Sequence, residues 1–118
     1  METLQKLLER MNNDKKTFDV TIGDNTFQCK KIPFGQLLSI DEGHDVETEV
    51  GSYERNQEVI YMCCDMFKKA INSIEYHGEP YKIVGKLLQP MEVYAFYSAI
   101  LQQYVKQQEK DVENIKKP

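Results

Sequence analysis

A run of apolar residues in the C-terminal half places the strongest constraint on how this chain can fold. Pro90 can open a helix there, because its missing N–H group is one that the first helical turn leaves unpaired anyway. Between Met91 and Leu101, nine of eleven residues are apolar, so a helix would carry apolar groups on nearly every side. Such a helix is either sandwiched between other elements or presents part of its surface to a partner chain.

Length and charge narrow the class of protein. The chain has 118 residues, which suits one domain. Glu92 and Ser98 interrupt the apolar run well before the roughly 20 residues that a membrane span needs, and the N-terminal residues show no signal-peptide pattern. The net charge of −4 argues against the basic surface on which nucleic-acid affinity depends. We therefore expect a cytoplasmic protein that binds neither membrane nor nucleic acid.

The N-terminal third predicts a helix and a hairpin. Apolar residues at helical spacing predict a short amphipathic helix that ends near Asn12 and Asn13; they are Leu4, Leu7, Leu8 and Met11. Apolar residues then alternate with polar ones on both sides of a turn at residues 23–25, as in a β-hairpin; they are Phe18, Val20, Ile22, Phe27 and Cys29. A lone hairpin is marginal in water, so its apolar face must pack on helices.

The middle of the chain is strongly acidic. Residues 41–58 hold seven acidic residues and a single basic one, Arg55. We expect residues 41–52 to form an acidic loop, too long to be a simple connector and therefore mobile or functional. A helix starting at Pro33 precedes this loop.

Helical patterns fill the rest of the chain. An amphipathic helix is expected from Glu58 to His77, with Gly78 and Pro80 as its stop signal. A short helix follows Pro80, with Gly85 as its weak point.

The predicted fold class is therefore α+β and predominantly helical, with the N-terminal β-hairpin packed on a compact bundle of about four helices. We expect a single globular domain over residues 1–108 and a flexible polar tail over residues 109–118.

No catalytic pattern emerges from the sequence. The six glycines are scattered and form no phosphate-binding loop. Cys63 or Cys64 could be paired with a histidine as a nucleophile, but burial as a reduced structural thiol is the commoner fate of such cysteines. The acidic residues around His44 do not have EF-hand spacing. We expect no enzyme activity, no cofactor and no metal site.

Three consecutive segments carry a resemblance to a known family. They are Glu58-Val-Ile-Tyr61, the stretch Glu79-Pro-Tyr-Lys-Ile-Val-Gly-Lys-Leu-Leu-Gln-Pro-Met-Glu92, and Val93-Tyr-Ala-Phe-Tyr-Ser-Ala-Ile100. In order and spacing, this part of the chain resembles the phage tail assembly chaperones of Gram-positive phages and prophages. Those proteins carry an "I-Y" helix, a "P-x-x-[IV]-V-x-x-L-L" segment and a hydrophobic helix that starts at Pro or Gly followed by Glu. The polar residues after Gln103 depart from the family's small-residue ending.

The resemblance implies a protein of the infected host cytoplasm, absent from the mature virion. It would bind the tape measure protein and keep it soluble until the tail tube polymerises. The tail tube protein would be a second partner, and self-association also stays open. One helical face would contact the client, and its residues are Tyr94, Tyr97, Leu101 and Tyr104; packing in the core is the other interpretation of the same face. The alternative function is a small acidic regulatory adaptor or antitoxin-like protein that acts through the same helix.

Overall fold

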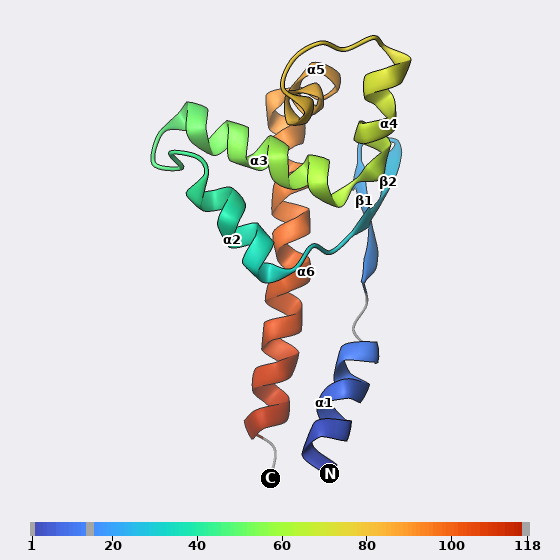
Figure 1. Ribbon diagram of the computed structural model, residues 1–118, viewed down its shortest axis with the longest axis vertical. Coiled ribbons are helices and arrows are strands. Elements are labelled where there is room, and N and C mark those ends of the chain that lie inside the picture. The colour runs from blue at the N-terminus through green and yellow to red at the C-terminus, as the bar shows by residue number, and fades with distance from the viewer. Residues whose placement is uncertain (1, 14–15, 117–118) are drawn as a thin grey trace.

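The apolar run forms the N-terminal half of a long helix that is the axis of the molecule. The computed structural model describes residues 2–13 and 16–116. This helix, α6 (Pro90–Lys116), runs along the longest dimension of the fold, which measures 53 Å (Figure 1). Gln89 and Glu92 cap its start, because the backbone N–H of Gln89 donates to the Glu92 carboxylate at 2.9 Å.

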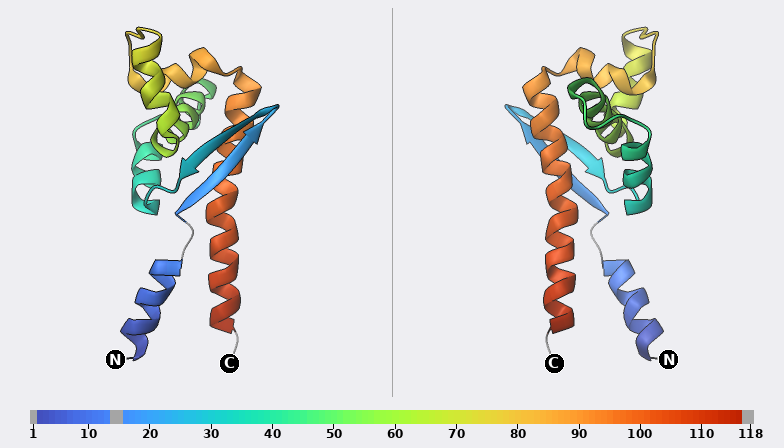
Figure 2. Two further views of the ribbon diagram at one scale, coloured as in Figure 1. Left: turned by 90° about the vertical axis from the view of Figure 1, so that its right-hand side faces the viewer. Right: turned by 90° about the vertical axis from the view of Figure 1, so that its left-hand side faces the viewer.

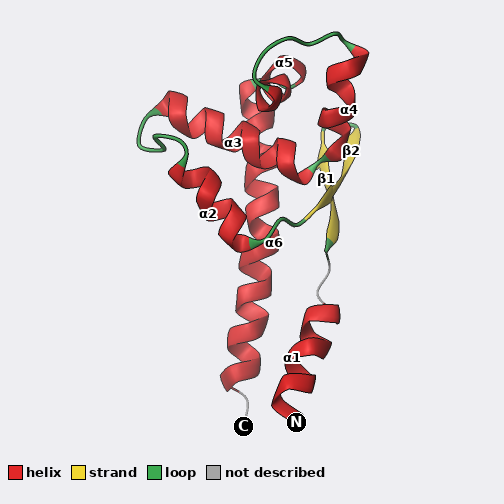
Figure 3. Cartoon of the chain, in the orientation of Figure 1, coloured by secondary structure: helices red, strands yellow, loops and turns green. Residues whose placement is uncertain are grey.

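The remaining elements pack around the N-terminal half of α6, except α1 (Glu2–Asn13), which lies level with its C-terminal half (Figure 1). They are α1, β1 (Thr17–Ile22), β2 (Asn25–Lys30), α2 (Phe34–Glu42), α3 (Glu49–Cys63), α4 (Asp65–Ser73), the 3-10 turn η1 (Pro80–Lys82) and α5 (Ile83–Leu87). Helices dominate, and the two strands form the only sheet among the described residues (Figure 3). The predicted class, α+β and predominantly helical with an N-terminal hairpin on helices, is confirmed.

The hairpin connects α6 to the rest of the core. Its strands pair antiparallel, with Val20 opposite Phe27 and Phe18 opposite Cys29. Gly23 opens the turn at φ 61°, a left-handed conformation that suits glycine. β1 lies against α6 and β2 against α4, as the two side views show (Figure 2). The hairpin thus gains from its neighbours the burial that it lacks alone.

Aromatic rings fill the centre of the core. Val93, Phe96 and Ile100 of α6 are fully buried. The Phe96 ring centroid lies 5.1 Å from that of Phe27 in β2, and Phe27 in turn stacks on Phe67 of α4 at 5.9 Å. One side of α6 is therefore sandwiched between the hairpin and the helices α3 to α5.

The acidic loop predicted over residues 41–52 is wrong in extent. α2 continues to Glu42 and α3 begins at Glu49, which leaves residues 43–48 between them. Thr48 caps α3 by accepting a hydrogen bond from the Gly51 N–H at 3.0 Å. Gly51 is buried against the Asp45 backbone carbonyl, where a side chain would clash. Because of this cap and the close packing at Gly51, α3 begins within residues 41–52, the segment whose acidic charge had suggested a loop.

The single helix predicted over residues 58–77 is also wrong, because α3 and α4 are separate helices. Cys64 lies between them in an extended conformation, with φ −120° and ψ 103°. Consecutive side chains on a helix point about 100° apart, so this break allows Cys63 and Cys64 both to be buried. α4 ends at Ser73, and Glu75 rather than Gly78 takes the left-handed conformation, at φ 50°. The predicted number of about four helices is low partly for this reason.

The two ends of the chain differ from the sequence-based expectation. α6 runs to Lys116, so residues 109–116 of the predicted flexible tail are helical, and residues 117–118 of that tail lie outside the described residues. Residues 109–116 contain no glycine or proline that would stop the helix. At the other end, α1 forms as predicted, but its apolar residues are 47–54% exposed. α1 and the C-terminal half of α6 extend from the same end of the molecule (Figures 1 and 2).

Candidate functional site

The side of α6 that faces away from the core presents an apolar surface. Its large side chains are 76% exposed at Met91, 62% at Tyr94 and 42% at Val105, and Leu101 is half-buried. At about 100° per residue these four positions fall within about 80° of the helix circumference. We call these residues the α6 seam: Met91, Tyr94, Leu101 and Val105. α6 thus also carries an apolar stripe that is exposed at Met91, Tyr94 and Val105 and partly covered at Leu101.

The four predicted contact residues do not share one exposed face. Counted around the helix from the buried arc, Tyr104 and Tyr97 come first, and Leu101 and Tyr94 lie roughly 40° and 60° beyond Tyr97. Tyr97, Leu101 and Tyr104 are partly buried and pack against the core, whereas Tyr94 keeps most of its surface. The predicted face therefore crosses the boundary between core and solvent.

Tyr104 has a structural role. Its hydroxyl donates to the Ile32 carbonyl oxygen at 2.6 Å and accepts from the Ile32 N–H at 3.0 Å. Its ring lies 6.3 Å from that of Phe34. Burial raises the pKa of the Tyr104 hydroxyl to about 12. The residue holds the segment between β2 and α2 against α6.

Tyr97 is covered by a cation. The Arg55 guanidinium lies over its ring, 4.6 Å from the centroid. Arg55 also donates to Asp41 of α2 at 2.6 Å and to Asn56 at 2.8 Å. Burial raises the pKa of the Tyr97 hydroxyl. The single basic residue of the acidic segment thus ties α2 and α3 to α6, and Tyr97 has little surface left for a client.

His44 forms a polar cluster that sequence reasoning missed. Its Nε2 lies 3.0 Å from Glu58 Oε1 and its Nδ1 lies 3.6 Å from Glu54 Oε2, and the ring meets Tyr81 edge-on at 5.6 Å. The His44 side chain is only 9% exposed. This cluster fastens the 43–48 loop onto α3 and η1. The spacing of these residues in the sequence did not predict the cluster. The 43–48 loop places His44 against α3, and the sequence predicted that this helix would start only at Glu58.

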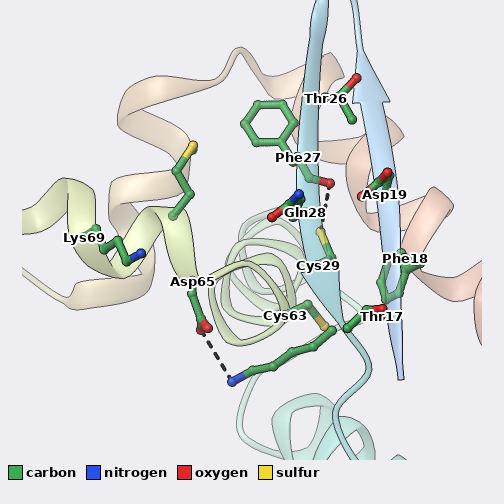
Figure 4. Close-up of a pocket in the computed structure, with 12 residues that line it drawn as sticks. Thr17, Phe18, Asp19, Thr26, Phe27, Gln28, Cys29, Cys63, Asp65 and Lys69 are labelled. Atoms are coloured by element: carbon green, nitrogen blue, oxygen red, sulfur yellow. Dashed lines mark hydrogen bonds and ion pairs between the residues drawn. The ribbon is translucent and has the colours of Figure 1, made fainter. Parts of the chain in front are cut away.

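A cleft opens between the hairpin and α4. Its volume is about 720 Å³, and Phe18, Phe27, Cys29, Cys63 and Met66 are among its lining residues (Figure 4). Lys30 of β2 and Asp65 of α4 pair at 3.5 Å across its wall. The sequence favoured a buried, reduced thiol at Cys63, and the structure has both Cys29 and Cys63 free and buried. The sequence could not show that β2 brings Cys29 to the junction of α3 and α4.

Several classes of site are not found in the described part of the chain. In residues 2–13 and 16–116, no group of three or more histidine, cysteine or acidic side chains is placed to hold a metal ion. None of the helices described is long and apolar enough to cross a membrane. Comparisons of the chain with protein-family models, with curated proteins and with solved structures found no match. The α6 seam is the candidate site because its large apolar side chains are exposed, and its chemistry is that of an apolar contact surface.

Proposed function

We propose that this protein is a phage tail assembly chaperone that binds the tape measure protein through the α6 seam. The observation that carries the proposal is the exposure of Met91 and Tyr94 on a helix whose opposite side is fully buried. Large apolar side chains gathered on one exposed stripe mark a surface for protein contact. The resemblance over residues 58–101 includes the helix that carries this stripe and supplies the identity of the client.

The seam suits a helical client. Met91, Tyr94, Leu101 and Val105 follow one another at intervals of three, seven and four residues, which keeps them on one face of the helix, the arrangement that pairs one helix with another. A tape measure protein is a long helical chain with apolar stripes, so a stripe on the client could pack along the seam. A rigid helix loses little conformational freedom on binding, and this preorganisation favours affinity.

α1 offers a second apolar stripe for the same purpose. Leu4, Leu7, Leu8 and Met11 are about half exposed and belong to a helix near the free end of α6. The net charge of −4 favours the solubility of a complex between this chain and an apolar client. In this proposal, tail tube subunits release the chaperone by competing for the client's apolar stripe.

The experiment is co-purification of a co-expressed fragment of the tape measure protein that the proposal assigns to this chain as its client. We expect the double variant Met91→Ser/Tyr94→Ser to retain less than a tenth of the fragment that the wild-type chain retains. The matched control is Val50→Ser, because Val50 is 69% exposed but lies on α3, away from the seam. Equal retention by the double variant and the wild type would contradict the proposed contact surface. A wild-type chain that retains no fragment would contradict the function itself.

A further inference from the structure

The outer edge of β2 carries backbone groups that the hairpin leaves unpaired. The ladder between the two strands continues one step past them, where the Lys31 N–H donates to the Lys16 carbonyl oxygen at 2.7 Å. Bonded and non-bonded pairs alternate along an antiparallel ladder. The N–H and carbonyl groups of Thr26, Gln28 and Lys30 therefore point away from β1. None of the hydrogen bonds described for residues 2–13 and 16–116 uses these groups.

The cleft between the hairpin and α4 lies along this edge. All the residues from 26 to 30 line it, and Asp65, Met66 and Lys69 stand on the α4 side (Figure 4). Residues 17–19 of β1 complete the lining on the hairpin side. The side chains of Gln28 and Lys30 are exposed. This edge of the sheet thus borders an open space of about 720 Å³.

The side of the cleft formed by β2 and α4 is positively charged. The Asp65 carboxylate is shared by Lys30, at 3.5 Å, and Lys68, at 3.7 Å. Lys69 is exposed in the same wall and makes none of the described ion pairs. Three lysines thus lie around one carboxylate, although the net charge of the whole chain is −4. Asp19, the other acidic residue of the lining, belongs to β1. A negatively charged partner is favoured at the β2 edge.

We propose that the outer edge of β2 binds an extended acidic segment of a partner protein, which joins the hairpin as a third strand. Outward N–H and carbonyl groups at every second residue match the backbone of another strand. Side chains of an added strand alternate between the two faces of the sheet. One row would lie level with Phe27 and Cys29, where Met66 is 45% exposed and favours apolar residues. The other row would lie level with Gln28 and Lys30 and suits acidic residues.

This surface is separate from the α6 seam, because none of the seam residues lines the cleft. The inference therefore goes beyond the proposed contact with a tape measure protein, and its test needs no such client.

The test is residue-resolved hydrogen exchange, measured by NMR on the intact protein with a synthetic peptide as the probe. The peptide is a hexapeptide of alternating glutamate and valine with both ends blocked. At a peptide concentration about ten times the dissociation constant, we expect exchange at the amides of Thr26, Gln28 and Lys30 to slow about tenfold. The amides of Phe27 and Cys29 already bond to β1 and should change less. A matched peptide with lysine in place of glutamate should bind at least about fivefold more weakly.

Two pairs of variants separate backbone pairing from charge. Gln28→Pro removes an outward N–H without removing a bond to β1, and edge strands tolerate proline. It should weaken peptide binding by about fivefold or more, whereas Gln28→Thr, which keeps the N–H, should bind like wild type. Lys69→Glu should weaken binding about threefold. Its control is Lys86→Glu, which makes the same change of charge at an exposed position on α5 that does not line the cleft.

Four results would overturn the proposal. The first is the absence of binding by the glutamate peptide at millimolar concentration, and the second is equal binding by the lysine peptide. The third is protection of the outward amides of β1, at Thr17, Asp19 and Thr21, in place of those of β2. The fourth is protection of the β2 amides that rises with protein concentration without peptide, which would identify a second copy of this chain as the occupant. Because the exchange map is recorded on the wild-type protein, a proline variant that fails to fold does not affect the conclusion.

Discussion

Replacing Tyr104 with phenylalanine tests whether its side of α6 has a structural role, in contrast to the exposed side that carries Tyr94. The substitution removes the hydroxyl that bonds to both backbone groups of Ile32, at 2.6 Å and 3.0 Å, and leaves the ring in place. Ile32 is 6% exposed, so water has little access to the N–H and carbonyl that lose their partner. Each hydrogen bond contributes about 1 kcal/mol, and a buried group left unpaired costs about 1 to 3 kcal/mol. We expect Tyr104→Phe to lower the free energy of unfolding by about 2 kcal/mol.

The assay is urea unfolding followed by circular dichroism. With a dependence on urea of about 1 to 3 kcal/mol per molar, the expected loss shifts the midpoint down by about 1 M. The control is Tyr94→Phe, because Tyr94 is 62% exposed and its hydroxyl makes none of the described hydrogen bonds. We expect that variant to stay within about 0.5 kcal/mol of wild type. If Tyr104→Phe is equally neutral, Tyr104 does not anchor the segment at Ile32, and the division of the helix into two sides is refuted.

Two further outcomes are expected. Gly85→Ala should lower the free energy of unfolding by about 1 kcal/mol in urea titrations, because the new Cβ would lie 2.5 Å from Gln57 Oε1 and overpacking outweighs the gain in helix propensity; a more stable variant would show that Gln57 moves aside. Burial raises the pKa of Cys63 to about 11 and that of Tyr104 to about 12, so the unfolded chain ionises at lower pH than the folded one. The stability that depends on these two groups being protonated should be fully present below about pH 9, the ordinary pKa of the thiol, and should be lost as the pH rises toward 11 to 12. The measurement is the urea midpoint, which should fall over this range. A midpoint that is flat to about pH 11 would contradict this.

Local sequence patterns predicted the elements that are determined by residues close together in the chain, such as the hairpin and the start of α6. The hairpin followed from alternation and turn residues, and its strands have the expected bounds within a residue or two. Pro90 and Glu92 marked the start of α6 correctly, since proline and a capping carboxylate act within one helical turn. The apolar run left two interpretations open, a sandwiched helix or a surface for a partner chain, and in the structure one side of α6 is sandwiched.

Features that depend on tertiary contacts could not be predicted in the same way. The break at Cys64 produces the burial of two consecutive cysteines between different elements, and no helical periodicity encodes it. Charge suggested a loop at residues 41–52, whereas the packing of Gly51 on the Asp45 carbonyl decides where α3 begins.

The candidate site shows the same limit. Helical spacing grouped Tyr94 with Tyr97 and Tyr104, but only the positions of Arg55 and Ile32 reveal which of these rings are already covered.

The central claim is that this chain keeps a tape measure protein soluble through the α6 seam, and the most direct measurement is the soluble fraction of that client. The proposed client, a full-length tape measure protein, would be expressed alone, with the wild-type chain, with Met91→Ser/Tyr94→Ser and with the control Val50→Ser. The account predicts a soluble client with the wild-type chain and with Val50→Ser, and an insoluble client alone or with the seam variant, whose own circular dichroism spectrum stays that of the wild type. A client that is equally insoluble with and without the wild-type chain would contradict the account.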